Sequence, residues 1–299
     1  MSSVQLLEDV ARLLERSPDF RVLRRLQPRE VFCADPCEQP LVGVVLDSET
    51  TGLDLDKAEV IELAMLKFQY SPAGEVLRVI DTFSELRQPA DPIPPEISAL
   101  TGISDEMVAG CAIDPAAVEA FVADASVVIA HNARFDRPIV QRTWPVFKTL
   151  DWACSLSDIA WREVGFEGAK LAYLLMGAGL FADAHRAIGD CQALLHLLSL
   201  PFGATGKPAL ATLLAHARQT TVRIFAVNSP YDRKDLLKAR GYRWYNGSDV
   251  RRRFWWRDVA ERDFEAEMAF LRARVFLRPI DLPTQRITAR ERYSISAPS

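Results

Sequence analysis

Residues 41–54, LVGVVLDSETTGLD, decide the fold and the site that we expect. The first six residues are apolar and half of them are β-branched, which is typical of a strand buried on both faces. Asp47 and Glu49 follow directly, and because side chains two apart on a strand share a face, both carboxylates should project together from the strand's carboxyl end. At about 4 Å and an effective dielectric near 20, two carboxylates repel by roughly 4 kcal/mol, which favours a bound cation. A solvated turn is the alternative for this pair alone.

Strands and helices alternate after this stretch. Further strands are predicted at 60–70, 75–86 and 127–130, and Ser71-Pro72-Ala73-Gly74 has the composition of a hairpin turn between the first two. Helices are predicted over 115–123, from about 137, around 156–164, and over 171–176 and 187–200. The sequence therefore predicts an α/β domain over 41–200, a sheet with helices packed on its faces.

The flanking regions differ in character. Apolar residues at helical spacing over 4–26 predict a helical extension within 1–40, and residues 201–220 read as a linker followed by a helix at 209–218. A small α+β module is expected over 221–280, with strands at 222–227, 242–245 and 252–257 and helices at 232–240 and 264–276. Residues 281–299 show little periodicity and are expected to form a tail.

Composition excludes several classes of protein. The chain has 49% apolar and 25% charged residues, and its apolar runs are far shorter than the roughly 20 residues that a bilayer span needs. Five cysteines at irregular spacing fit unpaired thiols in a reducing compartment. We therefore expect a cytoplasmic protein with no membrane partner.

Charge is distributed unevenly along the chain. Residues 1–220 contain 19 basic and 30 acidic residues, whereas the remainder contains 17 basic and 10 acidic residues. The basic part also holds Arg243-Trp244-Tyr245 and the run Arg251-Arg252-Arg253-Phe254-Trp255-Trp256-Arg257. Guanidinium groups reach phosphates and flat rings stack on unpaired bases, so Arg252 and Trp255 are candidate nucleic-acid contacts. Because adjacent residues of a strand point to opposite faces, at least one of Trp255 and Trp256 should belong to the core instead.

Two more segments place acids at junctions between strands and helices. His131-Asn132-Ala133-Arg134-Phe135-Asp136 follows the strand 127–130 and opens a helix, where α/β sheets bind ligands. Capping by Asn132, with Asp136 complementing the helix dipole, is the plainer alternative. Asp190 shares a helix face with Leu194 and Leu197, so it should project toward the interior. His185 can reach the same site only from a loop or frayed turn before that helix.

Together these motifs closely resemble those of the DEDDh 3′–5′ exonucleases, the family of the epsilon subunit of bacterial DNA polymerase III, ribonuclease T and exonuclease X. The first motif matches as Asp47-Ser48-Glu49-Thr50-Thr51-Gly52, the second as His131 to Asp136, and the third as His185 with Asp190. The stretch from Ile93 to Ile103 is similar to the family's loop and short helices ahead of the second motif. The resemblance covers approximately residues 41–200.

The resemblance implies a ribonuclease H-like fold, with a mixed sheet flanked by helices, and hydrolysis that uses two Mg²⁺ ions, for which Mn²⁺ can substitute. It assigns the metal ligands Asp47, Glu49, Asp136 and Asp190, and His185 as the general base. It also implies that Thr50, Thr51, Leu53, Asn132 and Phe135 bind the substrate. Ser48 occupies a variable position of the first motif.

The function expected is removal of nucleoside 5′-monophosphates from 3′ ends of single-stranded or frayed DNA, in proofreading or repair. DNA is favoured over RNA, but an RNA-trimming exoribonuclease of ribonuclease T type shares these motifs. A non-catalytic nucleic-acid-binding or polymerase-associated module is the third hypothesis, against which the intact set of acids argues. A polymerase or repair complex is a candidate partner.

Overall fold

The computed structural model describes residues 3–35, 37–182, 186–203, 206–246 and 253–294. The chain divides into two compact units, Met1–Leu214 and Ala215–Ser299, and the boundary falls within α8 (Ala209–Ala217). Among the described residues, no helix has the length and apolar character needed to cross a membrane.

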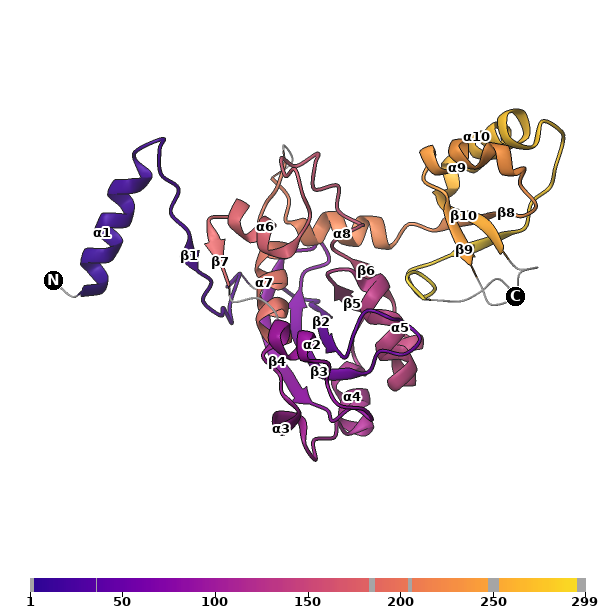
Figure 1. The fold of residues 1–299 in the computed structure, drawn as a ribbon. Helices are drawn as coiled ribbons and strands as arrows, with labels where there is room; N and C mark the ends of the chain where they lie inside the picture. Colours follow the sequence, from indigo (N-terminus) through magenta and orange to yellow (C-terminus); the bar gives the residue numbers. More distant parts are fainter. Residues whose placement is uncertain (1–2, 36, 183–185, 204–205, 247–252, 295–299) are drawn as a thin grey trace. The chain divides into compact units, whose positions relative to one another are not determined.

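A five-stranded mixed sheet organises the first unit (Figure 1). Its strand order is β4-β3-β2-β5-β6, and the strands are β2 (Leu41–Thr50), β3 (Val60–Tyr70), β4 (Val76–Leu86), β5 (Val127–Ala130) and β6 (Trp152–Cys154). The pairs β2–β3 and β3–β4 are antiparallel, whereas β2–β5 and β5–β6 are parallel. The predicted α/β class is thus confirmed, with β2 as the central strand.

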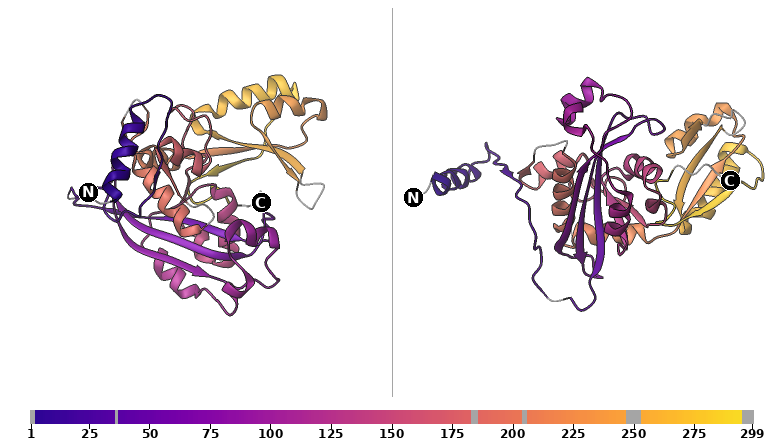
Figure 2. Two further views of the ribbon diagram at one scale, coloured as in Figure 1. Left: turned by 60° about the vertical axis from the view of Figure 1, so that its left-hand side comes forward. Right: turned by 90° about the horizontal axis from the view of Figure 1, so that it is seen from below.

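Helices cover both faces of this sheet. Helix α7 (Ala187–Ser199) packs against β2, β3 and β4, and α5 (Ala133–Thr143) packs against β2, β5 and β6. The two helices lie on opposite sides of the sheet (Figure 2). Val44, Val45 and Leu46 are therefore fully buried although they point to alternate faces. The remaining helical segments are α2 (Pro95–Thr101), α3 (Asp105–Val108), α4 (Pro115–Val122), η1 (Pro145–Lys148) and α6 (Leu171–Gly177).

Close packing explains a glycine in the deciding stretch. A Cβ atom added to Gly43 would lie 2.6 Å from Cζ of Phe68 on the neighbouring strand. Since real Cβ atoms do not approach other atoms so closely, the Phe68 ring occupies the space that a larger residue would need. Gly43 thus lets β3 bury an aromatic ring directly against β2.

Two predicted helices differ from the structure. The N-terminal helix is shorter than predicted, and the segment around 156–164 is not a helix. The N-terminal helix α1 spans Ser3–Glu15, and Arg24–Arg25 is instead a short strand, β1, parallel to β7 (Leu180–Phe181). Pro18 disfavours a helical conformation for the preceding residue and lacks a backbone N–H, which interrupts the apolar repeat. The helix predicted around 156–164 is a series of turns in which the indole N–H of Trp161 donates to the carbonyl of Ser155. Trp161 thus contributes to a buried ring cluster rather than to a helix face.

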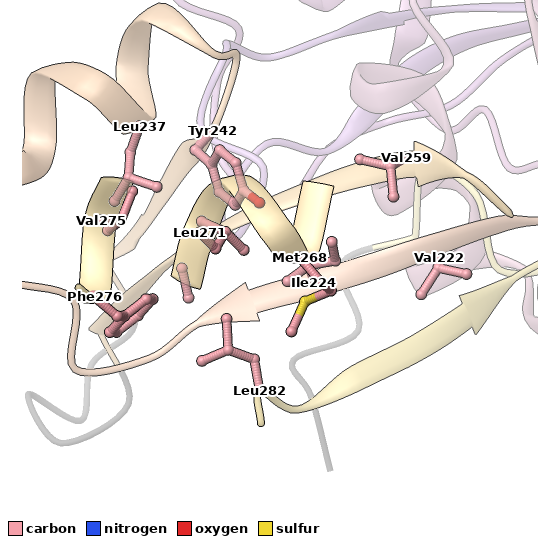
Figure 3. Close-up of a cluster of buried hydrophobic side chains, with 11 residues drawn as sticks. Val222, Ile224, Leu237, Tyr242, Val259, Met268, Leu271, Val275, Phe276 and Leu282 are labelled. Atoms are coloured by element: carbon pink, nitrogen blue, oxygen red, sulfur yellow. The ribbon is translucent and has the colours of Figure 1, made fainter. Parts of the chain in front are cut away.

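The second unit is a four-stranded antiparallel sheet with helices on one face. Its order is β11-β8-β10-β9, formed by β8 (Thr221–Ala226), β9 (Arg243–Asn246), β10 (Arg253–Ala260) and β11 (Thr284–Ile287). The helical segments are η2 (Tyr231–Arg233), α9 (Lys234–Ala239), η4 (Glu261–Asp263), α10 (Phe264–Phe270) and the π-helix η5 (Leu271–Phe276). Figure 3 shows α10 and η5 side chains meeting Val222 and Ile224 of β8 in the core. Strand β11 lies in the segment expected to be a tail.

Candidate metal centre

Three carboxylates from two elements converge at the end of β2. Asp47 and Glu49 lie two residues apart on β2, and Asp190 lies in the first turn of α7. One ligand atom from each lies within 4.8 Å of the others, and this trio is the only such group among the described residues. The alternation of β2 and the packing of α7 against β2 bring them together, so these three acids occupy a common site.

Asp136 approaches the same region from α5. It lies in the first turn of that helix and is 3% exposed. The hydroxyl of Ser48 donates a hydrogen bond of 2.8 Å to Oδ1 of Asp136. Asp136 also contributes electrostatically to raising the pKa of Asp47. Ser48, between the two acids of β2, therefore orients the carboxylate that α5 supplies.

Burial and mutual repulsion disfavour the charged forms of these acids. Burial, followed by the charges of Asp136 and Asp190, raises the pKa of Asp47 well above its ordinary value. Burial, followed by the charge of Asp190, raises the pKa of Glu49 to about 7. Burial likewise raises the pKa of Asp136 to about 7, against the hydrogen bond from Ser48, which lowers it. A cation between these groups would offset the repulsion.

A fifth carboxylate, Glu62, holds the helix that carries Asp190. Glu62 lies opposite Glu49 in the β2–β3 register and is 1% exposed. Its carboxylate accepts hydrogen bonds of 3.2 Å from Nη2 of Arg186 and from the backbone N–H of Ala187, at the start of α7. A negative charge there also complements the helix dipole. The sequence analysis missed this role, although Glu62 is a lone acid in the apolar run 60–66.

The first turn of α7 is fixed from a second side as well. The Cys191 thiol is buried between α7 and the sheet and contacts the carbonyl oxygens of Val45 and Ala64, at 3.8 and 3.6 Å. Burial raises the pKa of this thiol, which therefore stays protonated and acts as a small packing group. Asp190 thus projects from a rigid turn.

Two of the residues expected to bind substrate, Thr50 and Thr51, directly follow Glu49 along the chain. The β2–β3 register shifts between Glu49 and Thr50, where the strand ends in a bulge. Beyond it, the Thr51 N–H donates to the carbonyl of Glu59, and the Thr51 hydroxyl accepts from the Glu59 N–H. The Thr50 hydroxyl donates to the carbonyl of Gly52. This fixed turn presents Leu53 to solvent with 84% of its surface exposed.

The residues of the second motif have different environments: His131 is hydrogen-bonded on both ring nitrogens, whereas Asn132 is exposed. His131 is bonded to the hydroxyl of Ser155 and the carbonyl of Ala169, and burial lowers its pKa to about 4, so it is neutral and structural. Asn132 is exposed in a left-handed conformation (φ 89°), and its side chain makes no capping hydrogen bond to α5. The capping role considered for it is therefore wrong. Phe135 is half-buried in the first turn of α5.

Two of the candidate residues lie outside the described residues, namely His185 and Arg252.

Of the two adjacent tryptophans, Trp255 packs against the hydrophobic core of the second unit. Trp256 points to the other face, where the Arg223 and Arg243 guanidinium groups lie over its ring. The prediction that one of the two tryptophans belongs to the core is therefore confirmed, and that residue is Trp255.

The chemistry of this donor set fits a hard divalent cation. The ligand atoms are all carboxylate oxygens, which Mg²⁺ and Mn²⁺ prefer, and thiolate or imidazole groups are not among the clustered atoms of the described residues. Four buried or half-buried acids at the carboxyl end of a parallel strand pair fit the metal-assisted hydrolases as a class.

Comparison with known proteins narrows this class. Residues 44–198 match the sequence profile of the RNase T family, described as exonuclease. Since the match spans over half of the chain, the protein belongs to this exonuclease family and is a nuclease. Membership of the family also accords with the predicted ribonuclease H-like fold.

Curated relatives and solved structures were also found. A DNA polymerase III PolC-type of Halalkalibacterium halodurans is 42% identical over 169 residues, which are 52% of this chain and 11% of the polymerase. The corresponding protein of Thermotoga maritima is 32% identical over 161 residues, 50% of this chain and 11% of that protein. The chain thus spans about a tenth of the length of these relatives.

Among solved structures, Exonuclease X in complex with 5′ overhanging duplex DNA has 23% identity and a TM-score of 0.41, covering 56% of this chain and 99% of that one. E. coli Exonuclease I in complex with a 5cy-dT13 oligonucleotide has 14% identity and a TM-score of 0.48, covering 85% of this chain and 64% of that one.

Proposed function

We propose that this protein is a divalent-metal-dependent 3′–5′ exonuclease that releases nucleoside 5′-monophosphates from the 3′ ends of single-stranded or frayed DNA in the cytoplasm. The observation that carries the proposal is the convergence of Asp47, Glu49 and Asp190 within 4.8 Å. Three acids at this separation, with raised pKa values at Asp47 and Glu49, weaken the metal-free fold. Such an arrangement is accounted for by a bound cation.

The proposed roles follow the positions of the acids. Asp47, Glu49 and Asp190 would hold one ion, and Asp47 and Asp136 would hold a second. When bound, two Mg²⁺ ions activate a water molecule and stabilise the leaving 3′ oxygen of the scissile phosphodiester. Ser48 fixes the rotamer of Asp136, and Glu62 fixes the start of α7.

His185 is proposed as the general base, because imidazole titrates near neutral pH. It would accept the proton of the attacking water as the new P–O bond forms. The bond from phosphorus to the 3′ oxygen would break, and that oxygen would take up a proton from solvent water. The products are a nucleoside 5′-monophosphate and a strand shortened by one nucleotide with a new 3′ hydroxyl.

Substrate recognition is proposed for the exposed rim of the acid cluster. The turn after β2 holds the backbone of Thr50 and Thr51 in place for the terminal nucleotide. The exposed Leu53 side chain can wedge against its base, and Phe135 can pack on its sugar. Asn132 is free of a capping bond and can contact the same nucleotide. A wedge favours an end whose base pairs open easily.

DNA is the substrate we favour over RNA. Both relatives described above are named as DNA polymerases, and this chain aligns with about a tenth of each. A role beside a polymerase in proofreading, or in a repair complex, is consistent with that similarity. An exoribonuclease activity would share the same acids, so the comparison of the two substrates is part of the test.

The test is a time course with 5′-labelled single-stranded DNA and an RNA of matched sequence, in Mg²⁺, in Mn²⁺ and in EDTA. We expect metal-dependent shortening from the 3′ end, faster on DNA than on RNA. Asp47→Asn should reduce the rate at least 10³-fold without unfolding the protein, because the amide cannot replace a negative metal ligand. Asp81→Asn, at an exposed acid of β4, is the matched control and should retain the rate of the parent.

Each part of the proposal has its own contrary outcome. Parental activity of the Asp47→Asn variant would show that the acids are not the reaction centre. Faster shortening of RNA would identify an exoribonuclease of ribonuclease T type. A folded protein that binds Mg²⁺ but shortens neither substrate would be a non-catalytic nucleic-acid-binding module.

A further inference from the structure

The sheet of the second unit has a face that its helices do not use for the core. The β8–β10 and β9–β10 registers place Trp256 opposite Phe225 and Arg243, and Phe254 opposite Tyr245. Residues opposite each other in an antiparallel sheet share a face. The core cluster that α9, α10 and η5 complete takes Val222, Ile224 and Val259 from the other face (Figure 3). We call the first set the aromatic face; it consists of Arg223, Phe225, Arg243, Tyr245, Phe254 and Trp256.

Three rings of the aromatic face, one from each of β9, β10 and β8, form a continuous row. Tyr245 stacks on Phe254 with ring centroids 5.0 Å apart and planes inclined by 19°. Phe254 in turn meets Phe225 edge-on at 5.4 Å. Phe225 and Phe254 are buried, whereas Tyr245 and Trp256 remain partly exposed. The buried pair forms a floor, and Tyr245 and Trp256 retain surface that a planar ligand can cover.

The two arginines of this face have different electrostatic roles. The Arg223 guanidinium makes hydrogen bonds of 2.7 and 3.0 Å to the two carboxylate oxygens of Asp258, so its charge is balanced. It lies 4.4 Å from the Trp256 ring centroid and thereby fixes the indole from one side. Arg243 lies 5.5 Å from the same centroid, is exposed, and pairs with no carboxylate of the described residues. Among the described residues no acid balances its charge, so Arg243 can offer a positive charge to a ligand beside the held indole ring.

We propose that the aromatic face is a second nucleic-acid site, distinct from the acid cluster, which binds a single strand. Unpaired bases would stack on Trp256 and Tyr245, and a phosphate between them would contact Arg243. The charge of this part of the chain complements a polyanion, because residues 221–299 contain 17 basic and 10 acidic residues. Stacking of bases on aromatic rings depends little on sequence, so the site would retain strands without selecting them. This moves the predicted contact from Trp255 to Trp256.

The test measures binding of a 5′-fluorescein-labelled dT30 to the full chain by anisotropy, in EDTA so that no strand is cleaved. Trp256→Leu and Arg243→Glu should each raise the dissociation constant about fivefold or more, the first through lost stacking and the second through charge reversal. Tyr245→Leu should also raise the dissociation constant, and it tests the stacking in case the Trp256→Leu variant does not fold. A blunt duplex should compete less well than unlabelled dT30, because its bases are already stacked.

Matched substitutions on the opposite side provide the controls. Trp244→Leu makes the same change on the neighbouring strand, where Trp244 lies opposite Trp255 on the core side and is 48% exposed. Arg274→Glu reverses an exposed charge on η5, in the helix layer. Both should bind dT30 like the parent. Parental affinity of the Trp256, Tyr245 and Arg243 variants, or equal weakening by the two controls, would overturn the proposal.

A second readout separates this site from the exonuclease centre. Mg²⁺-dependent hydrolysis of the dinucleotide dTdT should be unchanged in all of these variants, because a dinucleotide is too short to occupy two sites. If the parent does not hydrolyse dTdT or longer strands, the proposed function fails while the binding comparison still stands. If hydrolysis of dTdT falls together with affinity for dT30 in the Arg243→Glu variant, the aromatic face is not a separate site.

Discussion

At the scale of single residues, the acids of the candidate metal centre carry pKa values that make the stability of the metal-free protein depend on pH. Burial raises the pKa values of Glu49 and Asp136 to about 7, whereas both groups ionise near pH 4 in an unfolded chain. Between these values the folded state binds more protons than the unfolded state. Its stability is therefore greatest below about pH 4 to 5, as far as these groups are concerned, and falls as the pH rises to about 7.

We therefore expect the melting temperature in EDTA to fall by roughly 5 °C or more between pH 5 and pH 8. Mg²⁺ at pH 8 should restore most of the loss, because it binds the ionised folded state. The measurement is a series of thermal melts with and without metal. A melting temperature that rises with pH in EDTA would mean that these acids are stabilised as anions by groups other than a metal.

Ser48 gives a second prediction at this scale. Its hydroxyl donates to Asp136 and lowers the pKa of that carboxyl, so Ser48→Ala should raise the pKa further and leave the rotamer less fixed. We expect the variant to bind Mg²⁺ more weakly, so that the Mg²⁺ concentration at half-maximal rate rises about tenfold. The acid limb of the pH–rate profile should shift to higher pH. Ser48→Thr, which keeps the hydroxyl, should behave like the parent; equal effects of both substitutions would point to packing instead.

At the scale of elements, Glu62 links β3 to the first turn of α7. Its carboxylate repels Glu49 and Asp47, yet it also accepts hydrogen bonds from Arg186 and from the Ala187 N–H. Removing it relieves repulsion but releases the turn that carries Asp190. Since the hydrogen bonds involve a buried charge, worth about 1.5–3 kcal/mol each, we expect the loss of positioning to dominate.

Glu62→Gln should therefore lower kcat at least tenfold with little change in KM, and Glu62→Ala should lower it further. Steady-state kinetics on labelled DNA, with thermal melts of each variant, measure both effects. Arg186→Met removes one of the two donors without touching the buried acid and should have a smaller effect on kcat. A Glu62→Gln variant with parental kcat would show that α7 holds Asp190 in place without this contact.

The sequence predicted the longer elements well because their patterns repeat over several residues. The strand at 60–70 and the helix at 187–200 agree with β3 and α7 to within a residue. Strand β6 has three residues and is defined by its parallel pairing with β5, which leaves no periodic pattern to recognise. The helix predicted around 156–164 is wrong for a related reason: Trp161 is buried by ring contacts with Phe166 and with Phe202, and Phe202 is distant in sequence.

In the candidate metal centre, too, some residues could be predicted from the sequence and others could not. Asp47 and Glu49 were predictable because strand alternation is local, and Asp190 because its helix has a clear apolar face. Ser48 and Glu62 were not, since their roles depend on a contact with α5 and on the β2–β3 register. Sequence patterns thus locate the acids, whereas the groups that orient them become visible only in three dimensions.

At the scale of the whole molecule, the two parts of the chain carry opposite net charge. Residues 1–220 have an excess of acidic residues, concentrated in part around a centre that must accept a phosphodiester, whereas residues 221–299 have an excess of basic residues. An acidic surface repels a strand at long range, and a basic one attracts it. A strand long enough to contact both parts should therefore be captured mainly through the basic part.

This division predicts a length-dependent response to salt. Raising NaCl from 50 to 200 mM should lower kcat/KM for a 30-nucleotide strand by about tenfold, which corresponds to the loss of two to three phosphate contacts. Hydrolysis of dTdT should change by less than about twofold, because it engages the acid cluster alone. Initial rates on the two substrates, at fixed Mg²⁺ and several salt concentrations, measure the two slopes. Equal slopes would mean that the basic part does not contribute to capture, and that its charge serves another interaction or only solvates the surface.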